Sequence, residues 1–116
     1  MSNIDVKKID SITVAKVTIK HIASDDDVHS ISREIKELLS DVDDKRIILN
    51  MEKVEVMASL MVGELIMLQK VFQKNSATLR LCSLNPTVVE SLRITGICDL
   101  LPIDEDEESS LAQILA

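Results

Sequence analysis

The sequence predicts an α/β domain with a mixed, mostly parallel sheet of about five strands and about four helices. Two strand-like segments open the chain, and helical and strand-like segments alternate after them. A short run of mostly apolar residues at 46–51 is typical of a parallel strand covered on both faces. The length of 116 residues fits one domain, which we expect to span residues 1–116.

The N-terminal part predicts two strands and a helix. Residues 3–9 and 11–19 have strand composition, and the apolar phase shifts near Lys16, which indicates either a bulge or an ambiguous pattern. Residues 24–42 follow as a helix, in which Ser24 and Asp27 have the spacing of a capping box. Its apolar residues recur at helical spacing and predict one buried face: Val28, Ile31, Ile35, Leu38, Leu39 and Val42.

The remaining segments alternate between strand and helix, and the later strands are expected to be parallel with right-handed crossovers. Their predicted ranges are a strand at 46–51, a deeply packed helix at 60–74, a strand at 78–83, a helix at 85–96, a strand at 98–103 and a helix at 104–116. The 85–96 helix has the clearest start and stop signals, with Asn85 as N-cap, Pro86 in the first position and Gly96 past the end. The last helix is expected to dock on the sheet through Leu111, Ile114 and Leu115.

Composition argues against nucleic acid and membrane as partners. One aromatic residue and a net charge of −7 provide neither stacking platforms nor a basic patch. The acidic runs 25–27 and 104–108 would repel an anionic membrane surface, and no apolar stretch is long enough to span a bilayer. The charged N-terminus does not resemble a signal peptide, so we expect a cytoplasmic protein with Cys82 and Cys98 as reduced core thiols.

The sequence contains no motif for catalysis, a cofactor or a metal. Two glycines in the whole chain exclude the glycine-rich nucleotide-binding loops. Ser59 has no histidine near it in sequence to form a catalytic triad. His21 and His29 lack ligand partners at a recognised spacing and are expected to be solvated. We therefore predict no catalytic residue, no cofactor and no metal site.

The segment 54–65, VEVMASLMVGEL, places Ser59 just before an apolar helix. Serine there is either an ordinary N-cap or a functional hydroxyl. Met57, Leu60, Met61 and Met67 cluster around the same point, and methionine is common on surfaces that repack against partners. We expect Met67 in the core, whereas the pattern leaves Leu60 and Met61 open between burial and exposure. An exposed apolar patch there would mark a binding site.

Two blocks of sequence resemble the STAS domain, the fold of bacterial anti-sigma factor antagonists. In that family a strand ending (I/V)-(I/V)-L-(N/D) leads to the motif D-S-(S/T)-G-(L/x)-G, which opens a helix. Residues 47–50 match the strand, and residues 58–63 fall on the motif with Ser59 and Gly63 kept. The later pattern LxxxNPxVxxxLxxTGxxxLL is matched by Leu81, Asn85, Pro86, Val88, Leu92, Thr95, Gly96, Leu100 and Leu101.

This chain departs from the first motif at three positions. The aspartate is replaced by Ala58, the second hydroxyl by Leu60 and the first glycine by Met61. The resemblance implies that Ser59 is the phosphorylation site of an anti-sigma factor that is also a serine kinase, and that a PP2C-type phosphatase resets it. This implied role is assigned to Ser59 and to no other position of the motif.

We therefore expect an anti-sigma factor antagonist-like protein, with a partner surface formed by Met57, Ala58, Ser59, Leu60, Met61 and Gly63. The alternative is a STAS subunit that no kinase modifies, within a transporter-associated or scaffolding complex. Small-ligand binding is a third class, for which the sequence carries no motif.

Overall fold

The structure is a computed structural model that describes residues 3–116. Its elements are β1 (Ile4–Ile9), β2 (Ile12–Val17), β3 (His21–Ile22), α1 (Asp25–Asp41), β4 (Arg46–Asn50), β5 (Val56–Met57), α2 (Ser59–Lys74), β6 (Thr78–Cys82), α3 (Pro86–Ile94), the 3₁₀ helix η1 (Ile97–Leu100), β7 (Ile103–Asp104) and α4 (Glu107–Leu115).

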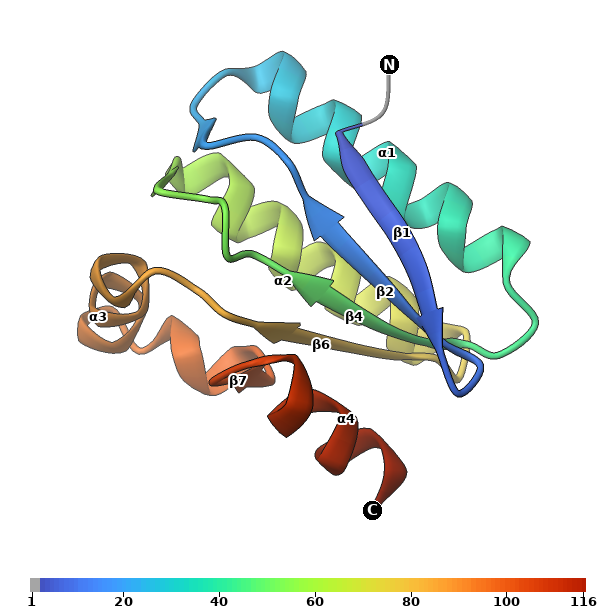
Figure 1. The fold of residues 1–116 in the computed structure, drawn as a ribbon. Helices are drawn as coiled ribbons and strands as arrows, with labels where there is room; N and C mark the ends of the chain where they lie inside the picture. The colour runs from blue at the N-terminus through green and yellow to red at the C-terminus, as the bar shows by residue number, and fades with distance from the viewer. Residues whose placement is uncertain (1–2) are drawn as a thin grey trace.

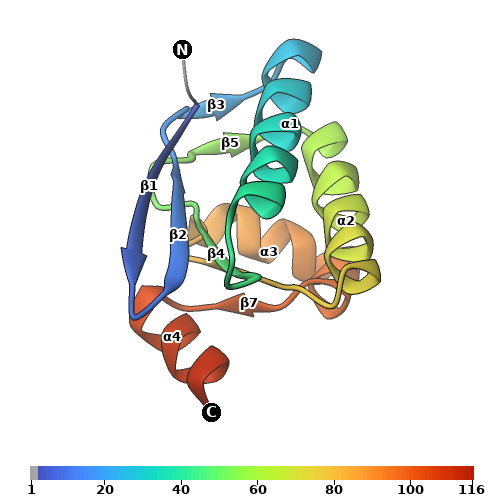
Figure 2. The ribbon, with the colours of Figure 1, turned by 90° about the vertical axis from the view of Figure 1, so that its right-hand side faces the viewer.

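A five-stranded mixed sheet of order β1-β2-β4-β6-β7 organises the fold. β1 and β2 pair antiparallel, and the β2–β4, β4–β6 and β6–β7 pairs are parallel, as the sequence predicts. Helices α1 and α2 cover one face of this sheet and α4 covers part of the other, while α3 lies beyond the carboxyl end of β6 (Figures 1 and 2). This arrangement confirms the predicted mixed, mostly parallel α/β fold with four α-helices.

The two faces of the sheet build two apolar clusters of unequal size. The larger one lies under α1 and α2 and includes Ile35, Leu49, Leu65 and Phe72, all fully buried. The smaller one lies under α4 and joins Ile12, Val14, Ile48 and Cys82 to Leu111 and Ile114. Leu115 does not dock as predicted, because it lies at the end of α4 and is 55% exposed.

The pattern of apolar residues shifts near Lys16 because β2 is a central strand of the sheet. β2 lies between β1 and β4, so Thr13, Val14 and Ala15 are all buried and side chains on both faces are covered. The β1–β2 register runs without interruption from Ile4↔Val17 to Ile9↔Ile12, which excludes the bulge. A buried central strand therefore loses the simple alternation of a half-exposed one.

The predicted caps of α1 and α3 are confirmed. Ser24 accepts a hydrogen bond from the Asp27 N–H at 3.1 Å, and Asn85 accepts one from the Thr87 N–H at 2.8 Å. Gly96 follows α3 with φ of 78°, a left-handed conformation that glycine adopts without steric cost. These local signals fix where both helices begin and where α3 ends.

Three predictions about the elements and the thiols were wrong or incomplete. The predicted strand at 98–103 is a 3₁₀ helix over Ile97–Leu100 followed by the two-residue strand β7. Cys98 is only half-buried, whereas Cys82 lies in the core as expected. The two-residue strands β3 and β5, which form a separate parallel pair, were not predicted at all.

Polar contacts attach α4 and its approach to the sheet. Arg80 on β6 forms two hydrogen bonds with the Asp104 carboxylate, at 2.6 and 2.8 Å, and Asp104 also accepts one from the Ser110 hydroxyl at 2.6 Å. The guanidinium of Arg80 holds the pKa of Asp104 below its ordinary value, against the opposing effect of burial. No helix among residues 3–116 is long and apolar enough to cross a membrane.

Candidate functional site at the start of helix α2

The small β3–β5 pair determines where α2 begins. The Val56 N–H donates to the Lys20 carbonyl at 3.1 Å, and the Ala58 N–H donates to the Ile22 carbonyl at 2.8 Å. These bonds hold residues 56–58 extended at the carboxyl end of the main sheet, and the chain turns into α2 immediately afterwards. Ser59 is therefore placed by backbone hydrogen bonds that join both ends of β5 to the β3 segment.

Ser59 is the first residue of α2 and not its N-cap, so the N-cap interpretation was wrong. The cap position belongs to Ala58, which has an extended backbone and no side chain able to accept a hydrogen bond. The Ala58 carbonyl accepts from the Met61 N–H at 2.9 Å. Within residues 3–116, neither the Ser59 hydroxyl nor the N–H groups of Ser59 and Leu60 have a hydrogen-bond partner. The exposed hydroxyl thus lies beside two free donors at the positive end of a helix dipole.

The predicted contact residues separate into accessible and inaccessible positions. Leu60 is 43% exposed, and Ser59 and Gly63 are also exposed. Met57 and Ala58 are half-buried. Met61 is fully buried in the large cluster, so this residue lies outside any partner surface. Gly63 faces open space, since an added Cβ would have no atom within 4 Å.

Met67 was predicted in the core and is instead 54% exposed. It lies two turns after Leu60, and the two side chains therefore extend the same exposed face of α2. The helix as a whole is not buried on all sides, because only Met61, Leu65, Leu68 and Phe72 are fully buried. Apolar residues occur in nearly every direction around α2, and the sequence pattern could not indicate which of them face solvent.

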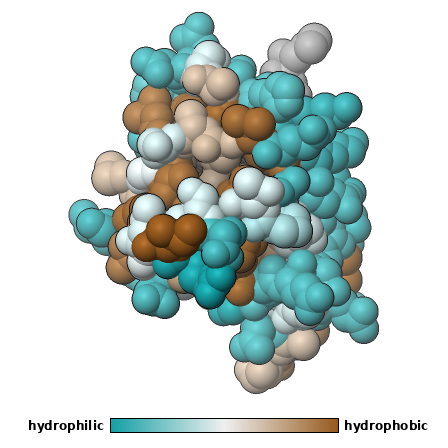
Figure 3. Space-filling model, turned by 90° about the vertical axis from the view of Figure 1, so that its left-hand side faces the viewer, coloured by the Kyte–Doolittle hydropathy of each residue, from teal (hydrophilic) through white to brown (hydrophobic). Residues whose placement is uncertain are grey.

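A groove runs between the start of α2, β5 and α3. It encloses about 230 Å³ and is lined by Glu55, Val56, Met57, Val62, Thr87, Val88, Ser91 and Leu92. Val56 is 50% exposed and Ile94, near the end of α3, is 76% exposed. Figure 3 views this side and shows apolar side chains gathered over the region of α3 and the start of α2, whereas the side toward β1 and α4 is mostly hydrophilic.

The α3 wall of this groove was missing from the predicted site. Val88 and Leu92 occur one helical turn apart, so their spacing places both on the same face of α3. That spacing was present in the sequence, but it gave no information on which element the face would meet. Only the fold brings α3 next to β5.

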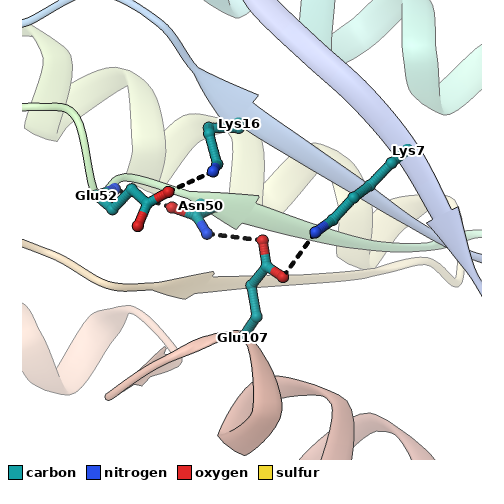
Figure 4. Close-up of polar contacts among 5 residues, drawn as sticks. All are labelled: Lys7, Lys16, Asn50, Glu52 and Glu107. Atoms are coloured by element: carbon teal, nitrogen blue, oxygen red, sulfur yellow. Dashed lines mark hydrogen bonds and ion pairs between the residues drawn. The ribbon is translucent and has the colours of Figure 1, made fainter.

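A second polar arrangement lies near the carboxyl ends of β2 and β4 and involves Lys7, Lys16, Asn50, Glu52 and Glu107 (Figure 4). The buried Asn50 donates to the Glu107 carboxylate at 2.7 Å and accepts from the Glu52 N–H at 2.9 Å. Lys7 pairs with Glu107 at 3.1 Å, and Lys16 pairs with Glu52. Burial acts to raise the pKa of Glu107, but the bonds from Asn50 and Lys7 outweigh it and the pKa is lowered.

This arrangement is a structural connection with its groups already paired. In residues 3–116, no group of three or more histidine, cysteine or acidic side chains is placed to hold a metal ion. His21 and His29 are both exposed. The accessible, unpaired hydroxyl of Ser59 and the groove beside it therefore form the candidate functional site.

Comparison with known proteins agrees with this architecture. The sequence profile of the STAS domain matches residues 3–110. The chain belongs to the STAS domain family. A search among curated proteins gives no match.

Three solved structures illustrate the range of proteins with this fold. An anti-sigma-factor antagonist (STAS) domain protein from Planctomyces limnophilus superposes with a TM-score of 0.80 at 19% identity, covering 97% of this chain and 98% of that one. The phosphorylated form of the Bacillus cell fate determinant SpoIIAA gives 0.66 at 17% identity, with 96% and 98% covered. A sulfate transporter family protein from Wolinella succinogenes gives 0.70 at 16% identity, with 90% and 85% covered. The fold therefore occurs both in an anti-sigma factor antagonist and in a sulfate transporter family protein.

Proposed function

We propose that this chain is a cytoplasmic signalling protein of the anti-sigma factor antagonist type, and that it acts by binding a protein partner through the start of α2 and the adjoining groove. The single observation that carries the proposal is Ser59, an exposed and unbonded hydroxyl in the first helical position beside an apolar groove. The partner is an anti-sigma factor with serine kinase activity, and a PP2C-type phosphatase reverses the modification. The proposed action is binding, and no catalytic residue is assigned.

The surroundings of Ser59 suit a switch that changes binding and leaves the fold intact. A phosphate adds about −1.5 to −2 charge. The free N–H groups of Ser59 and Leu60 and the helix dipole would stabilise that charge where it stands. The same charge would oppose burial of Leu60 and Val56 against an apolar partner surface, because it would lose its hydration. Phosphorylation is therefore expected to release the partner.

The modification is tested by incubating the protein with ATP and each candidate serine kinase encoded in the same genome. Mass spectrometry then locates the phosphate. We expect phosphate on Ser59 and none on the Ser59→Ala variant. Phosphate on another residue, or none with every candidate kinase, would remove the basis for the switch.

Binding is tested with a partner recovered by pull-down, using three variants in a calorimetric or surface-based assay. Ser59→Asp is expected to weaken binding at least about tenfold, since it adds charge within the surface, while Ser59→Ala leaves binding close to normal. Ser76→Asp is the matched control, because Ser76 is also exposed and follows the opposite end of α2. It adds the same charge away from the site and is expected to have no effect.

A second candidate function is supported by the residues that flank Ser59. Ala58 and Leu60 give it no acidic neighbour and no second hydroxyl, and the fold is also similar to a sulfate transporter family protein. In this alternative the chain is an unmodified STAS subunit of a transporter-associated or scaffolding complex. It predicts that Ser59→Ala and Ser59→Asp bind the partner equally well, so the same assay separates the two candidates.

A further inference from the structure

Strand β1 forms an open edge of the main sheet. It pairs with β2 on one side, and no strand in the described residues 3–116 pairs with its other side. Figure 1 shows β1 at one margin of the sheet, with α1 running alongside it. Val6, in the middle of β1, is 50% exposed although it is apolar. Such an edge presents backbone donors and acceptors to any strand that can align with it.

The register of the β1–β2 pair identifies the backbone groups that face outward. The Thr18 N–H donates to the Asn3 carbonyl at 3.0 Å, so residue 3 forms a hydrogen-bonded pair with β2. Hydrogen-bonded and non-hydrogen-bonded positions alternate along an antiparallel pair. Asp5 and Lys7 therefore bond toward β2, and the N–H and C=O of Val6 point away from it.

The charges on β1 are complementary to those of a second, antiparallel copy in one register. If Val6 pairs with Val6 of the second copy across a two-fold axis, Asp5 of each copy stands opposite Lys7 of the other. Both side chains lie on the face of the sheet that carries α4, since Lys7 contacts Glu107 there. Sliding one strand by two residues relative to the other changes the opposed residues. It places Asp5 opposite Asp5 in one direction and Lys7 opposite Lys7 in the other. Among these three registers, only the one centred on Val6 avoids opposed like charges, which are destabilising across strands.

We propose that two copies of this chain associate through β1, antiparallel and centred on Val6, into a continuous ten-stranded sheet. The pairing forms the two hydrogen bonds of a Val6–Val6 pair, covers both exposed valine side chains and adds two Asp5–Lys7 ion pairs. Lysines on an edge strand commonly prevent pairing, but in this register each Lys7 meets a carboxylate. The Lys7 side chain is 54% exposed, so its ammonium can contact Asp5 of the second copy as well as Glu107.

The dimer does not depend on the function proposed for Ser59, and it leaves that site accessible. The start of α2 lies at the opposite side of the molecule from β1 (Figure 1). A dimer of this form carries two Ser59 sites and can bind a multivalent partner with increased avidity.

The test uses charge reversal with light scattering and sedimentation over a wide range of concentration. The native protein is expected to dimerise. Asp5→Lys and Lys7→Asp are each expected to weaken dimerisation at least about tenfold, because each variant opposes like charges at both ion pairs. An equimolar mixture of these two variants is expected to form a heterodimer, since every opposed pair is then complementary. Asp26→Lys, an equal charge change in the exposed first turn of α1, is the matched control and leaves the dimer unchanged.

Circular dichroism of each variant confirms that its fold is retained. A native protein that remains monomeric at every concentration would overturn the proposal. A dimer that persists in both single variants would overturn it too, as would a mixture that stays monomeric while both variants are folded. Val6→Lys provides an independent check that leaves the Lys7–Glu107 contact in place, and it is expected to abolish the dimer because two added lysines would meet on the axis.

Discussion

Helices α2 and α4 both begin near the carboxyl ends of sheet strands, but their first turns are satisfied in different ways. At α4, the Asp106 carboxylate caps the Ser109 N–H at 2.8 Å, and Glu107 is bound by Asn50 and Lys7. At α2, Ala58 offers no side-chain cap, and the Ser59 hydroxyl has no partner within residues 3–116. The start of α4 is bonded to the sheet, whereas the Ser59 hydroxyl at the start of α2 makes no hydrogen bond within residues 3–116.

This difference indicates where the chain can change without unfolding. Removing a group from the start of α4 leaves a partner without its bond, and a buried unpaired group is costly. Removing the hydroxyl at the start of α2 leaves no internal partner unsatisfied. Stability measurements on matched variants therefore test the comparison directly.

The largest effect is expected from Asn50→Ala at the α4 start. Asn50 is 3% exposed, and its loss leaves the partly buried Glu107 carboxylate and the Glu52 N–H without this partner. We expect a loss of about 1–3 kcal/mol in the free energy of unfolding, measured by urea denaturation. Hydrogen exchange is expected to increase first in α4. Lys16→Ala is the control, since its partner Glu52 is exposed, and it is expected to cost less than about 0.5 kcal/mol. Equal losses in both variants would mean that Asn50 does not connect α4 to the sheet.

An intermediate gain is expected from Ala58→Asp at the α2 start. The Ala58 backbone is already extended, so an aspartate there can accept a bond from a free N–H of the first turn. We expect stabilisation of about 1 kcal/mol, seen as a higher urea midpoint with an unchanged slope. Ala58→Leu cannot cap and is expected to give no gain. A stabilisation of the same size in both variants would assign the effect to packing and not to capping.

The smallest effect on stability is expected from Ser59→Ala. This change is expected to stay within about 0.5 kcal/mol, because the hydroxyl makes no hydrogen bond. Ser24→Ala is the matched comparison, since Ser24 caps α1 and its loss is expected to cost about 1 kcal/mol. Thermal or urea unfolding of the two variants measures both values. A loss at Ser59 equal to that at Ser24 would restore the N-cap interpretation.

The sequence predicted the long elements well because each carries a strong local signal. Ser24 and Asn85 marked two helix starts correctly, and the apolar run of β4 indicated a buried parallel strand. Strands β3 and β5 have two residues each, which is too short for any apolar periodicity to be visible in the sequence. Their hydrogen bonds depend on strands that are distant in sequence, so only the folded chain specifies them.

The structure tests the predicted site residues only through their exposure, and the exposure agrees at some positions and differs at others. Ser59 and Leu60 are exposed as a partner surface would require, whereas Met61 is buried and Met67 is exposed. Both errors have one cause, since apolar side chains surround most of α2 and its orientation is set by contacts with α1 and the sheet. The hydrogen bond from Ser32 to Glu64, at 2.7 Å, is one such contact, and no sequence pattern predicts it.

Gly63, inside α2, lowers the stability of the helix and leaves its backbone accessible. Gly63 has an ordinary helical backbone and open space where a side chain would be, so folding gains nothing from it. A glycine in a helix interior is less stable than alanine by roughly 0.5–1 kcal/mol. The chain therefore carries a helix weaker than its own fold would permit, one turn beyond Ser59. Because Gly63 has no side chain, the backbone of α2 is uncovered at this turn. Another surface could approach this backbone more closely than it could approach a helix turn that carries a side chain.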